Sequence, residues 1–219
     1  MKIAILGGTG KEGAGLGLRW AAAGHELIIG SRVAERAVQT AAALAEALPE
    51  RVAVQGSDNL TAAQQADVVI LSVPYAAQAA TLNAVKEALA GKLLISVVVP
   101  LQPPQVSRVW LPPAGSAAQE AQALLGETTR VVAAFQNVSA EHLEDFAHDV
   151  DCDVLVCGDK LADREVAVRL AADAGMRGVH AGPLQNAAVV EGLTAVLISI
   201  NVRYKIKNAG IRITGLPES

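Results

Sequence analysis

A cluster of glycines near the start of the chain has the spacing of a nucleotide-binding loop. Directly after a predicted strand at 2–6, Gly8, Gly10 and Gly13 fit the pattern G-x-G-x-x-G. In this pattern the first glycine permits a tight turn, the second lets the backbone approach a pyrophosphate, and the third lets the next helix pack closely on the strand. The N-terminus of that helix offers free N–H groups and a positive dipole end to phosphate. We therefore predict that a dinucleotide binds here, through Gly8, Thr9, Gly10, Lys11, Glu12 and Gly13.

The residues after the second predicted strand distinguish between the two common nicotinamide dinucleotides. Proteins that bind NAD usually place Asp or Glu there, to hold the ribose 2′-hydroxyl. This chain instead has Ser31 and Arg32, with Arg36 one helical turn further on. Two guanidinium groups and a hydroxyl suit a 2′-phosphate dianion, and Thr9 could add a hydroxyl from the facing loop. The pattern predicts NADP; the alternative is that Ser31 only caps the next helix and that the arginines are solvated.

Short β-branched runs alternate with alanine-rich helical stretches through residues 1–134. The alternation is typical of a doubly wound, parallel α/β sheet of the Rossmann type, which we expect to form the NADP-binding domain. Asn59 is expected to cap its helix, and the proline-rich stretch 100–113 to form a loop. The predicted strands cover 2–6, 26–29, 52–55, 68–73, 93–99 and 130–134, and the predicted helices cover 12–23, 33–48, 59–66, 76–89 and 117–125.

Residues 135–219 are predicted to form a smaller C-terminal α/β domain. Strands are expected at 154–156 and 178–180, with a helix at 163–174 and a long terminal helix. Residues 193–200 of that last helix are almost wholly apolar, more than one exposed face of a helix tolerates. We therefore expect this helix to supply both the core of the small domain and a contact between two copies in a homodimer.

The composition excludes several other classes of protein. The 219 residues carry a net charge of −4 and are 52% hydrophobic, whereas disordered chains combine low hydrophobicity with high net charge. The basic surplus of a nucleic-acid binder is absent, and the longest uncharged stretch contains proline and amides, unlike a membrane span. The two cysteines, Cys152 and Cys157, suggest small buried residues rather than a disulfide, so we expect a cytoplasmic protein.

The histidines do not suggest a metal site. His142 and His148 lie among acidic residues, but a separation of six does not place them on one face of a helix. We interpret them as part of a solvated acidic surface and predict no metal.

Several short motifs are spread along nearly the whole chain. They are Gly-Gly-Thr-Gly at 7–10, Gly-His-Glu at 24–26, Gly-Ser-Arg at 30–32, Ser-Val-Pro at 72–74, Phe-Gln-Asn-Val-Ser-Ala at 135–140, Val-Cys-Gly-Asp at 156–159, Ala-Gly-Pro-Leu at 181–184 and Glu-Gly-Leu-Thr at 191–194. In these motifs the chain resembles the NADPH-dependent coenzyme F420 reductases, also called F420H2:NADP oxidoreductases. Some members have a His-Thr-Ile-Pro type segment where this chain has Gln136-Asn137-Val138-Ser139, so no role of that histidine carries over.

The resemblance implies hydride transfer between C4 of the nicotinamide of NADP(H) and C5 of the deazaflavin coenzyme F420. The residues implied to hold the 2′-phosphate are Thr9, Ser31, Arg32 and Arg36. Those implied to border the nicotinamide are Val73, Pro74 and Val98, and those implied to line the deazaflavin are Gln136, Asn137, Val138 and Ser139. We add Gln78 to the expected cofactor-binding residues.

This chemistry makes few demands on catalytic side chains. Both reacting atoms belong to cofactors, so the protein must chiefly align two rings and exclude water, and we predict no catalytic residue. The deazaflavin also gains a proton, and the sequence does not identify its donor. Aromatic residues make up only 3% of the chain, and we expect Tyr75 and Phe135 to be the aromatics near the deazaflavin.

Two other functions fit the predicted Rossmann sheet. One is a different small NADP-dependent reductase, acting on an imine or a keto compound, although the C-terminal part offers no convincing substrate acid or base. The other is a non-enzymatic NADP-sensing protein, which would bind NADPH without reducing an acceptor. A short-chain dehydrogenase fits less well, because its loop needs glycine where Ala14 stands.

Overall fold

Runs of four to six residues, apolar in most of them, form the strands of a parallel sheet in this computed structural model, which describes residues 1–48, 52–143 and 150–216. Within these residues the main sheet has six strands in the order β3-β2-β1-β4-β5-β6, and every neighbouring pair is parallel. This confirms the predicted doubly wound α/β sheet. The strands are β1 (Lys2–Leu6), β2 (Glu26–Ser31), β3 (Val54–Asp58), β4 (Val68–Leu71), β5 (Leu93–Ser96) and β6 (Arg130–Ala133).

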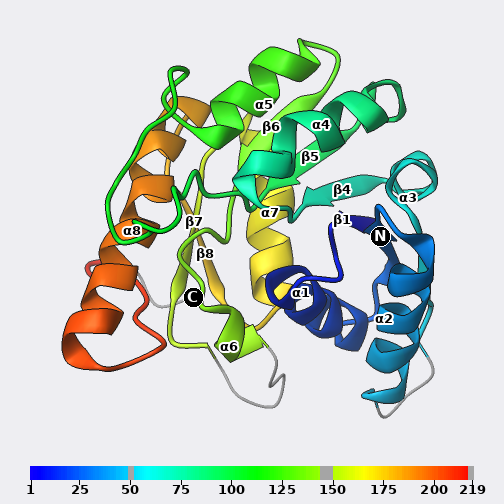
Figure 1. Cartoon of the computed structure of the whole chain (residues 1–219), viewed down its shortest axis with the longest axis horizontal. Helices are drawn as coiled ribbons and strands as arrows, with labels where there is room; N and C mark the ends of the chain where they lie inside the picture. Colours follow the sequence, from blue (N-terminus) through cyan, green and yellow to red (C-terminus); the bar gives the residue numbers. More distant parts are fainter. Residues whose placement is uncertain (49–51, 144–149, 217–219) are drawn as a thin grey trace.

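Helices cover both faces of this sheet (Figure 1). Successive side chains of a strand point to opposite faces, so Ile3 and Ile5 of β1 enter one apolar core while Ala4 and Leu6 enter the other. The first core is closed by α1 (Lys11–Ala22), α2 (Ala34–Glu46) and α7 (Leu161–Asp173). The second is closed by α3 (Asn59–Gln65), α4 (Tyr75–Val85), α5 (Ala117–Leu125), the short η1 (Lys86–Leu89) and η2 (Leu184–Asn186), and the first turns of α8 (Ala187–Tyr204).

The C-terminal part packs directly onto the main sheet. Its strands β7 (Asp153–Val156) and β8 (Arg177–His180) form a small parallel sheet, preceded by α6 (Ala140–Leu143). An antiparallel bridge joins the two sheets, since Ala133 and Cys157 exchange N–H···O bonds of 2.8 and 2.9 Å. One apolar core continues across position 135.

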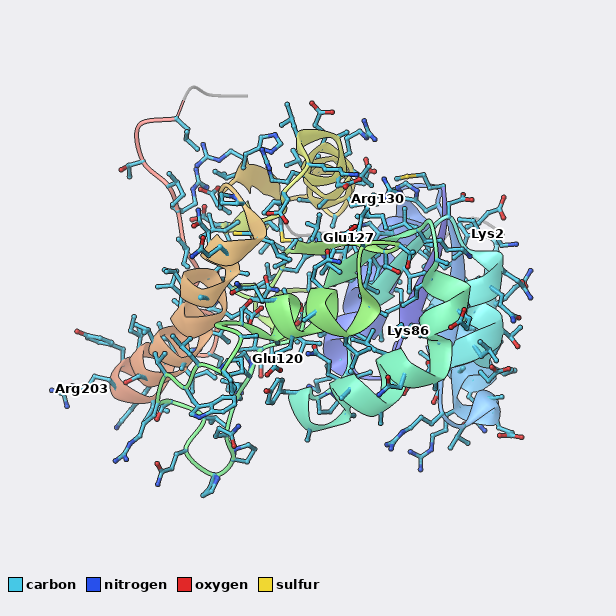
Figure 2. The ribbon with its side chains drawn as sticks, turned by 90° about the horizontal axis from the view of Figure 1, so that it is seen from above. Lys2, Lys86, Glu120, Glu127, Arg130 and Arg203 are labelled. Carbon is cyan, nitrogen blue, oxygen red and sulfur yellow. The ribbon has the colours of Figure 1, made fainter. Side chains whose placement is uncertain are left out.

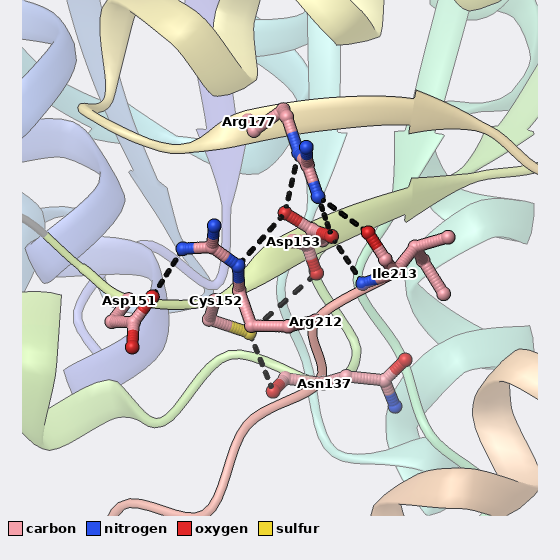
Figure 3. A network of polar contacts seen from close by, with 7 residues as sticks. All are labelled: Asn137, Asp151, Cys152, Asp153, Arg177, Arg212 and Ile213. Atoms are coloured by element: carbon pink, nitrogen blue, oxygen red, sulfur yellow. Dashed lines mark hydrogen bonds and ion pairs between the residues drawn. The ribbon is translucent and has the colours of Figure 1, made fainter. Parts of the chain in front are cut away.

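The C-terminal tail is fastened to the small sheet by a charged network (Figure 3). Asp153 accepts hydrogen bonds from Arg177 Nε at 2.8 Å and from the N–H of Ile213 at 2.6 Å, and Arg177 also donates to the carbonyl of Ile213 at 2.9 Å. The hydrogen bond from Arg177 lowers the pKa of Asp153, which keeps the pair ionised. The tail is therefore a fixed part of the fold up to this point.

Two local predictions about the third strand and the helix after it are wrong. The strand lies at Val54–Asp58 rather than 52–55, because α2 crosses directly over Gly56: a Cβ there would lie 2.3 Å from the backbone of Ala37. The helix after it is capped by Asp58, whose Oδ1 accepts the N–H of Thr61 at 2.9 Å, and not by Asn59. The predicted helix 76–89 also divides into α4 and η1.

Helix α8 stands at one edge of the molecule, and its last turn carries Arg203 away from the rest of the fold (Figure 2). Val190 and Leu197 are buried against the molecule, whereas Val189, Val196 and Val202 are exposed. By length and composition, the stretch Leu184–Tyr204 could cross a membrane, a property that core helices of soluble proteins share.

Candidate functional site

The glycine loop brings three backbone segments together at the carboxyl edge of the sheet. Gly7 has φ +74°, and a Cβ there would lie 2.4 Å from the carbonyl oxygen of Ser72, at the end of β4. A Cβ on Gly13 would lie 2.9 Å from Cα of Gly8, so the first turn of α1 packs on the loop itself. Only glycine permits both contacts, which leaves the backbone as the surface offered to a ligand.

Helix α1 points its N-terminus into this edge. Gly10 is the N-cap residue, and no side chain caps the helix there. The N–H groups of the first turn are therefore open to an anion, and the dipole of a 12-residue helix favours negative charge at the same place. The loop and helix together fit a pyrophosphate.

A pocket of about 230 Å³ lies beside the loop and collects most of the predicted NADP residues. A second cavity of about 370 Å³ shares Arg32, Asn59 and Pro74 with it and continues along α4 past Ala80 and Ala84. The first pocket is lined by Gly7, Thr9, Gly10, Ser31, Arg32, Val33, Arg36, Asn59, Ser72, Val73, Pro74, Ala77 and Thr81.

Two arginines provide the positive charge of this pocket. Arg32 and Arg36 are both exposed, and no carboxylate of the described residues pairs with either. Ser31 is buried, and its Oγ accepts the N–H of Val33 at 3.2 Å, which leaves its hydroxyl hydrogen for another acceptor. Two free guanidinium groups beside a hydroxyl donor form a receptor for a phosphate dianion.

Asn59 is a pocket residue that the sequence assigned to a different role. Its Oδ1 accepts the N–H of Gly7 at 3.4 Å, so the side chain braces the glycine loop instead of capping α3. Asn59 directly follows β3 at the carboxyl edge of a parallel sheet, and this position could have indicated that it belongs to the ligand site. Ala77 and Thr81, which share one face of α4, were also missed because alanine-rich helices show no polar pattern.

Six of the residues predicted to bind NADP do not line this pocket: Gly8, Lys11, Glu12 and Gly13 of the glycine loop and the first turn of α1, and Gln78 and Val98. Gln78 is buried and faces α5, where its Nε2 donates to the carbonyl of Ala117 at 2.9 Å. Val98 is buried in the core beyond β5, close to the end of the strand. Their part in cofactor binding stays a prediction.

The segment 136–139 is tied to the fold by its own side chains. Gln136 Nε2 donates to the carbonyl of Ser96 at 2.8 Å, and Asn137 Nδ2 donates to the carbonyl of Val190 at 2.9 Å. Val138 is buried, and Ser139 Oγ donates to the carbonyl of Lys207 at 3.2 Å. The amide oxygens of Gln136 and Asn137 are enclosed without a partner. The segment thus connects β5, α8 and the tail, and its contact with a deazaflavin stays a prediction.

Comparison with known proteins identifies the family. A family model described as NADP oxidoreductase coenzyme F420-dependent matches residues 2–100. The F420-dependent NADP reductase of Methanothermobacter marburgensis is 47% identical over 100% of both chains, and that of Methanocaldococcus jannaschii is 44% identical over 99% of both. The chain belongs to the F420-dependent NADP reductase family. The structure of a putative member from Arthrobacter sp. FB24 matches with a TM-score of 0.82 at 28% identity, covering 98% of this chain and 99% of that one.

Family membership confirms the resemblance, but one aromatic residue expected near the deazaflavin is not available. Phe135, at φ +74°, is buried and packs edge-on against Trp20 with ring centroids 5.6 Å apart. Tyr75 is half-buried; its hydroxyl donates to Glu120 at 2.8 Å, and burial together with Glu120 raises its pKa to about 12. The prediction for Phe135 is therefore wrong, because its ring fills the core between α1 and α7.

One acidic side chain in the glycine loop stands apart from the other members of the site. Glu12 is half-buried, yet its Oε1 is enclosed and makes no hydrogen bond with any described residue. Burial raises the pKa of Glu12 to about 8, because the charged form loses its hydration. The side chain therefore holds a proton at neutral pH.

No cluster of three or more His, Cys, Asp and Glu that could hold a metal occurs in the described ranges, and His148 lies outside them. Cys152 and Cys157 are free and buried, and burial raises the pKa of Cys157 to about 11. Neither thiol is poised to act as a nucleophile.

Proposed function

We propose that this protein transfers a hydride between NADP(H) and coenzyme F420. The observation that carries the proposal is an arginine pair with no opposing acid, beside a phosphate-binding loop, in a chain related to F420-dependent NADP reductases along its full length. When bound, the nicotinamide and the deazaflavin supply the two carbon atoms between which the hydride moves. The protein binds, orients and dehydrates them.

The dinucleotide is held from one end to the other by separate groups. Ser31, Arg32 and Arg36, with Thr9, bind the 2′-phosphate, and the N-terminus of α1 binds the pyrophosphate. The adenine occupies the alanine-lined extension along α4, which offers apolar surface and little else. This arrangement favours NADP over NAD because NAD lacks the 2′-phosphate that these side chains bind.

The nicotinamide borders the ends of β4 and β5, which pair in parallel with Leu71 opposite Ser96. Val73, Pro74 and Val98 supply its apolar wall, and Gln78 acts indirectly by fixing α4 against α5. Residues 136–139 line the deazaflavin. The two rings lie between residues 1–134, the NADP-binding part, and residues 135–219, which complete the cleft.

The exposed side of α8 supports a homodimer. Val189 and Val196 are 69% and 42% exposed, and Val109 of the 100–113 loop packs beside Gly192 on the same helix. Exposed apolar side chains gathered on one side of a helix favour an interface. We assign it to a second copy in a cytoplasmic enzyme, a compartment that suits two free cysteines; nucleic acid and membrane are not partners. Sedimentation velocity of Val196→Glu against the wild type, expecting a shift from dimer to monomer, tests this.

One assay tests the proposed reaction. Purified protein is mixed with NADP and reduced F420, and the absorbance of the deazaflavin is followed. We expect oxidised F420 and NADPH to form together, with a much slower reaction when NAD replaces NADP. Reduction of an imine or keto compound with F420 left untouched would point to a different reductase. Binding of NADPH with no acceptor reduced would point to a sensor, and either result overturns the proposal.

A further inference from the structure

Glu12 lies in the first turn of α1, directly after the glycine loop. Glu12 and Gly15 are three residues apart, so they share a face of α1. That face packs on α6, since a Cβ on Gly15 would lie 2.5 Å from Cβ of Leu143 (Figure 1). Helical side chains lean toward the N-terminus, a tendency that directs the Glu12 carboxyl toward the segment that joins β6 to α6. This is the segment that contains residues 136–139.

No hydrogen bond from the described residues reaches the enclosed Oε1 of Glu12. The charged or titratable side chains on the two elements that pack here are Lys11 and Arg19 of α1 and Glu141 and His142 of α6. Arg19 donates to the carbonyls of Ala174 and His142, at 2.9 and 2.8 Å. Burial is the cause of the raised pKa of Glu12, and no charged neighbour of the described residues contributes to it. An enclosed carboxyl of this kind stays neutral until a cation comes close.

The proposed course of the dinucleotide brings such a cation to this side. With the 2′-phosphate at Arg32 and Arg36 and the pyrophosphate on α1, the nicotinamide end crosses the loop toward β4. The first turn of α1 is in contact with the end of that strand: a Cβ on Gly13 would lie 3.1 Å from Oγ of Ser72. The nicotinamide ring is cationic in NADP⁺ and neutral in NADPH. Its charge therefore changes next to Glu12.

We propose that Glu12 is the proton-carrying residue of the site: a neutral acid with NADPH and a carboxylate with NADP⁺. The inference rests on the proposed function. As NADPH is oxidised, its C4–H bond breaks and the hydride forms a C–H bond at C5 of the deazaflavin. The O–H bond of Glu12 breaks, and its electron pair stays on the carboxylate facing the cationic ring. The released proton is the one that the deazaflavin nitrogen gains, and the reverse direction returns it.

Binding of each nucleotide alone tests this, without F420. Isothermal titration of the full chain at pH 7.5, in two buffers of different ionisation enthalpy, measures the protons released. For a group of pKa near 8, NADP⁺ should release about half to one proton more than NADPH. Both nucleotides carry the same 2′-phosphate, so this difference reports the nicotinamide alone. Glu12→Gln should abolish it, and Glu87→Gln, which removes an exposed acid far from the loop, should retain it.

The affinities give a second readout. In the wild type, the Kd of NADP⁺ divided by the Kd of NADPH should fall as pH rises toward 8, by up to about tenfold per pH unit. In Glu12→Gln the ratio should not change with pH. Equal proton release or equal pH dependence in the wild type and Glu12→Gln would overturn the role of Glu12 and leave the proposed function intact.

An infrared difference spectrum of the wild type covers the case in which Glu12→Gln does not fold. Addition of NADP⁺, but not NADPH, should remove a protonated carboxylic acid band; an unchanged band overturns the inference. If the wild type binds neither nucleotide, both the proposed function and the inference about Glu12 are overturned. If NADP⁺ releases the proton from Glu12 but F420 does not turn over, the inference is supported and the proposed reaction is not.

Discussion

The phosphate end of the candidate site and the segment 135–139 are built in opposite ways. Arg32 and Arg36 are exposed and make no ion pair with any described residue. In the segment, by contrast, Phe135 fills the core, and Gln136 and Asn137 use their amide groups to bind β5 and α8. The first region can lose its side chains without harm to the fold, whereas in the second the fold depends on side chains that are also proposed to line the deazaflavin.

The largest effect is expected at the phosphate end. Replacing both arginines, Arg32→Ala with Arg36→Ala, should raise the KM for NADPH about 100-fold or more, since each hydrogen bond to a charged group contributes about 1.5–3 kcal/mol. The KM for NADH should change less than about threefold, and Tm should stay the same because exposed, unpaired side chains contribute little stability. Arg169→Ala on the exposed side of α7 is the control. An equal rise in the KM for NADH would contradict the assignment of Arg32 and Arg36 to the 2′-phosphate.

Phe135→Ala should instead reduce stability while leaving NADPH binding in place. Truncating a buried phenylalanine costs about 3–5 kcal/mol, here because the ring leaves a cavity against Trp20. Urea denaturation measures the loss in the free energy of unfolding. Phe135→Leu, which refills most of the volume, should recover more than half of it. A loss below about 1 kcal/mol for the alanine variant would contradict the structural role assigned to this ring.

The burial of Glu191 should make the free energy of unfolding depend on pH, an effect that the exposed arginines do not have. It is fully buried and accepts the N–H groups of Ala117 and Ala118 at 2.7 and 3.0 Å, yet burial outweighs these donors and raises its pKa to about 7. The folded state then binds more protons than the unfolded state between about pH 4.5 and 7. Its contribution to stability is therefore full below that window and is lost as pH rises through it.

The comparison of Glu191→Gln with the wild type isolates this effect. Between pH 5 and pH 8, the free energy of unfolding of the wild type should fall by about 2 kcal/mol more than that of the variant, measured by urea titration at several pH values. Glu127→Gln, an exposed acid beyond α5 (Figure 2), should follow the wild type. Parallel curves for Glu191→Gln and the wild type would show that Glu191 keeps an ordinary pKa.

The smallest effect is expected at Ser139, where the segment meets the tail. Ser139→Ala removes an exposed hydrogen bond of 3.2 Å to Lys207 and should cost about 0.5 kcal/mol of stability, with no change in the Kd of NADPH. The KM for F420 should rise a few fold if this segment lines the deazaflavin. An unchanged KM would place the deazaflavin elsewhere and weaken the assigned role of residues 136–139.

Much of the fold followed from local patterns. The buried runs of β1, β4 and β5 are continuous and apolar, which is typical of parallel strands covered on both faces. Strand β3 was misplaced because its residues are largely polar and its position depends on Gly56 beneath α2. The hydrophobic pattern of a sequence does not locate a strand well when the close packing of a helix backbone on the strand decides where the strand lies.

The sequence anticipated the contacts of the two regions to different degrees. It grouped residues of the glycine loop with the arginines, which line one pocket, because they lie within about thirty residues of one another at the ends of adjacent strands. The sequence did not reveal Asn59 as a brace for Gly7, or the amides of Gln136 and Asn137 as internal ties. Each of these contacts joins residues that are 40 to 53 positions apart in the sequence. The two partners meet only when the chain has folded.

The sequence by itself therefore determined the alternating α/β pattern, the phosphate loop and the preference for a 2′-phosphate, because spacing along the backbone is enough to specify them. Tertiary structure alone decided that Phe135 belongs to the core and that Oε1 of Glu12 is enclosed with no hydrogen bond from the described residues. Burial depends on which distant segments cover a side chain, and burial is what changes the charge state of an acid.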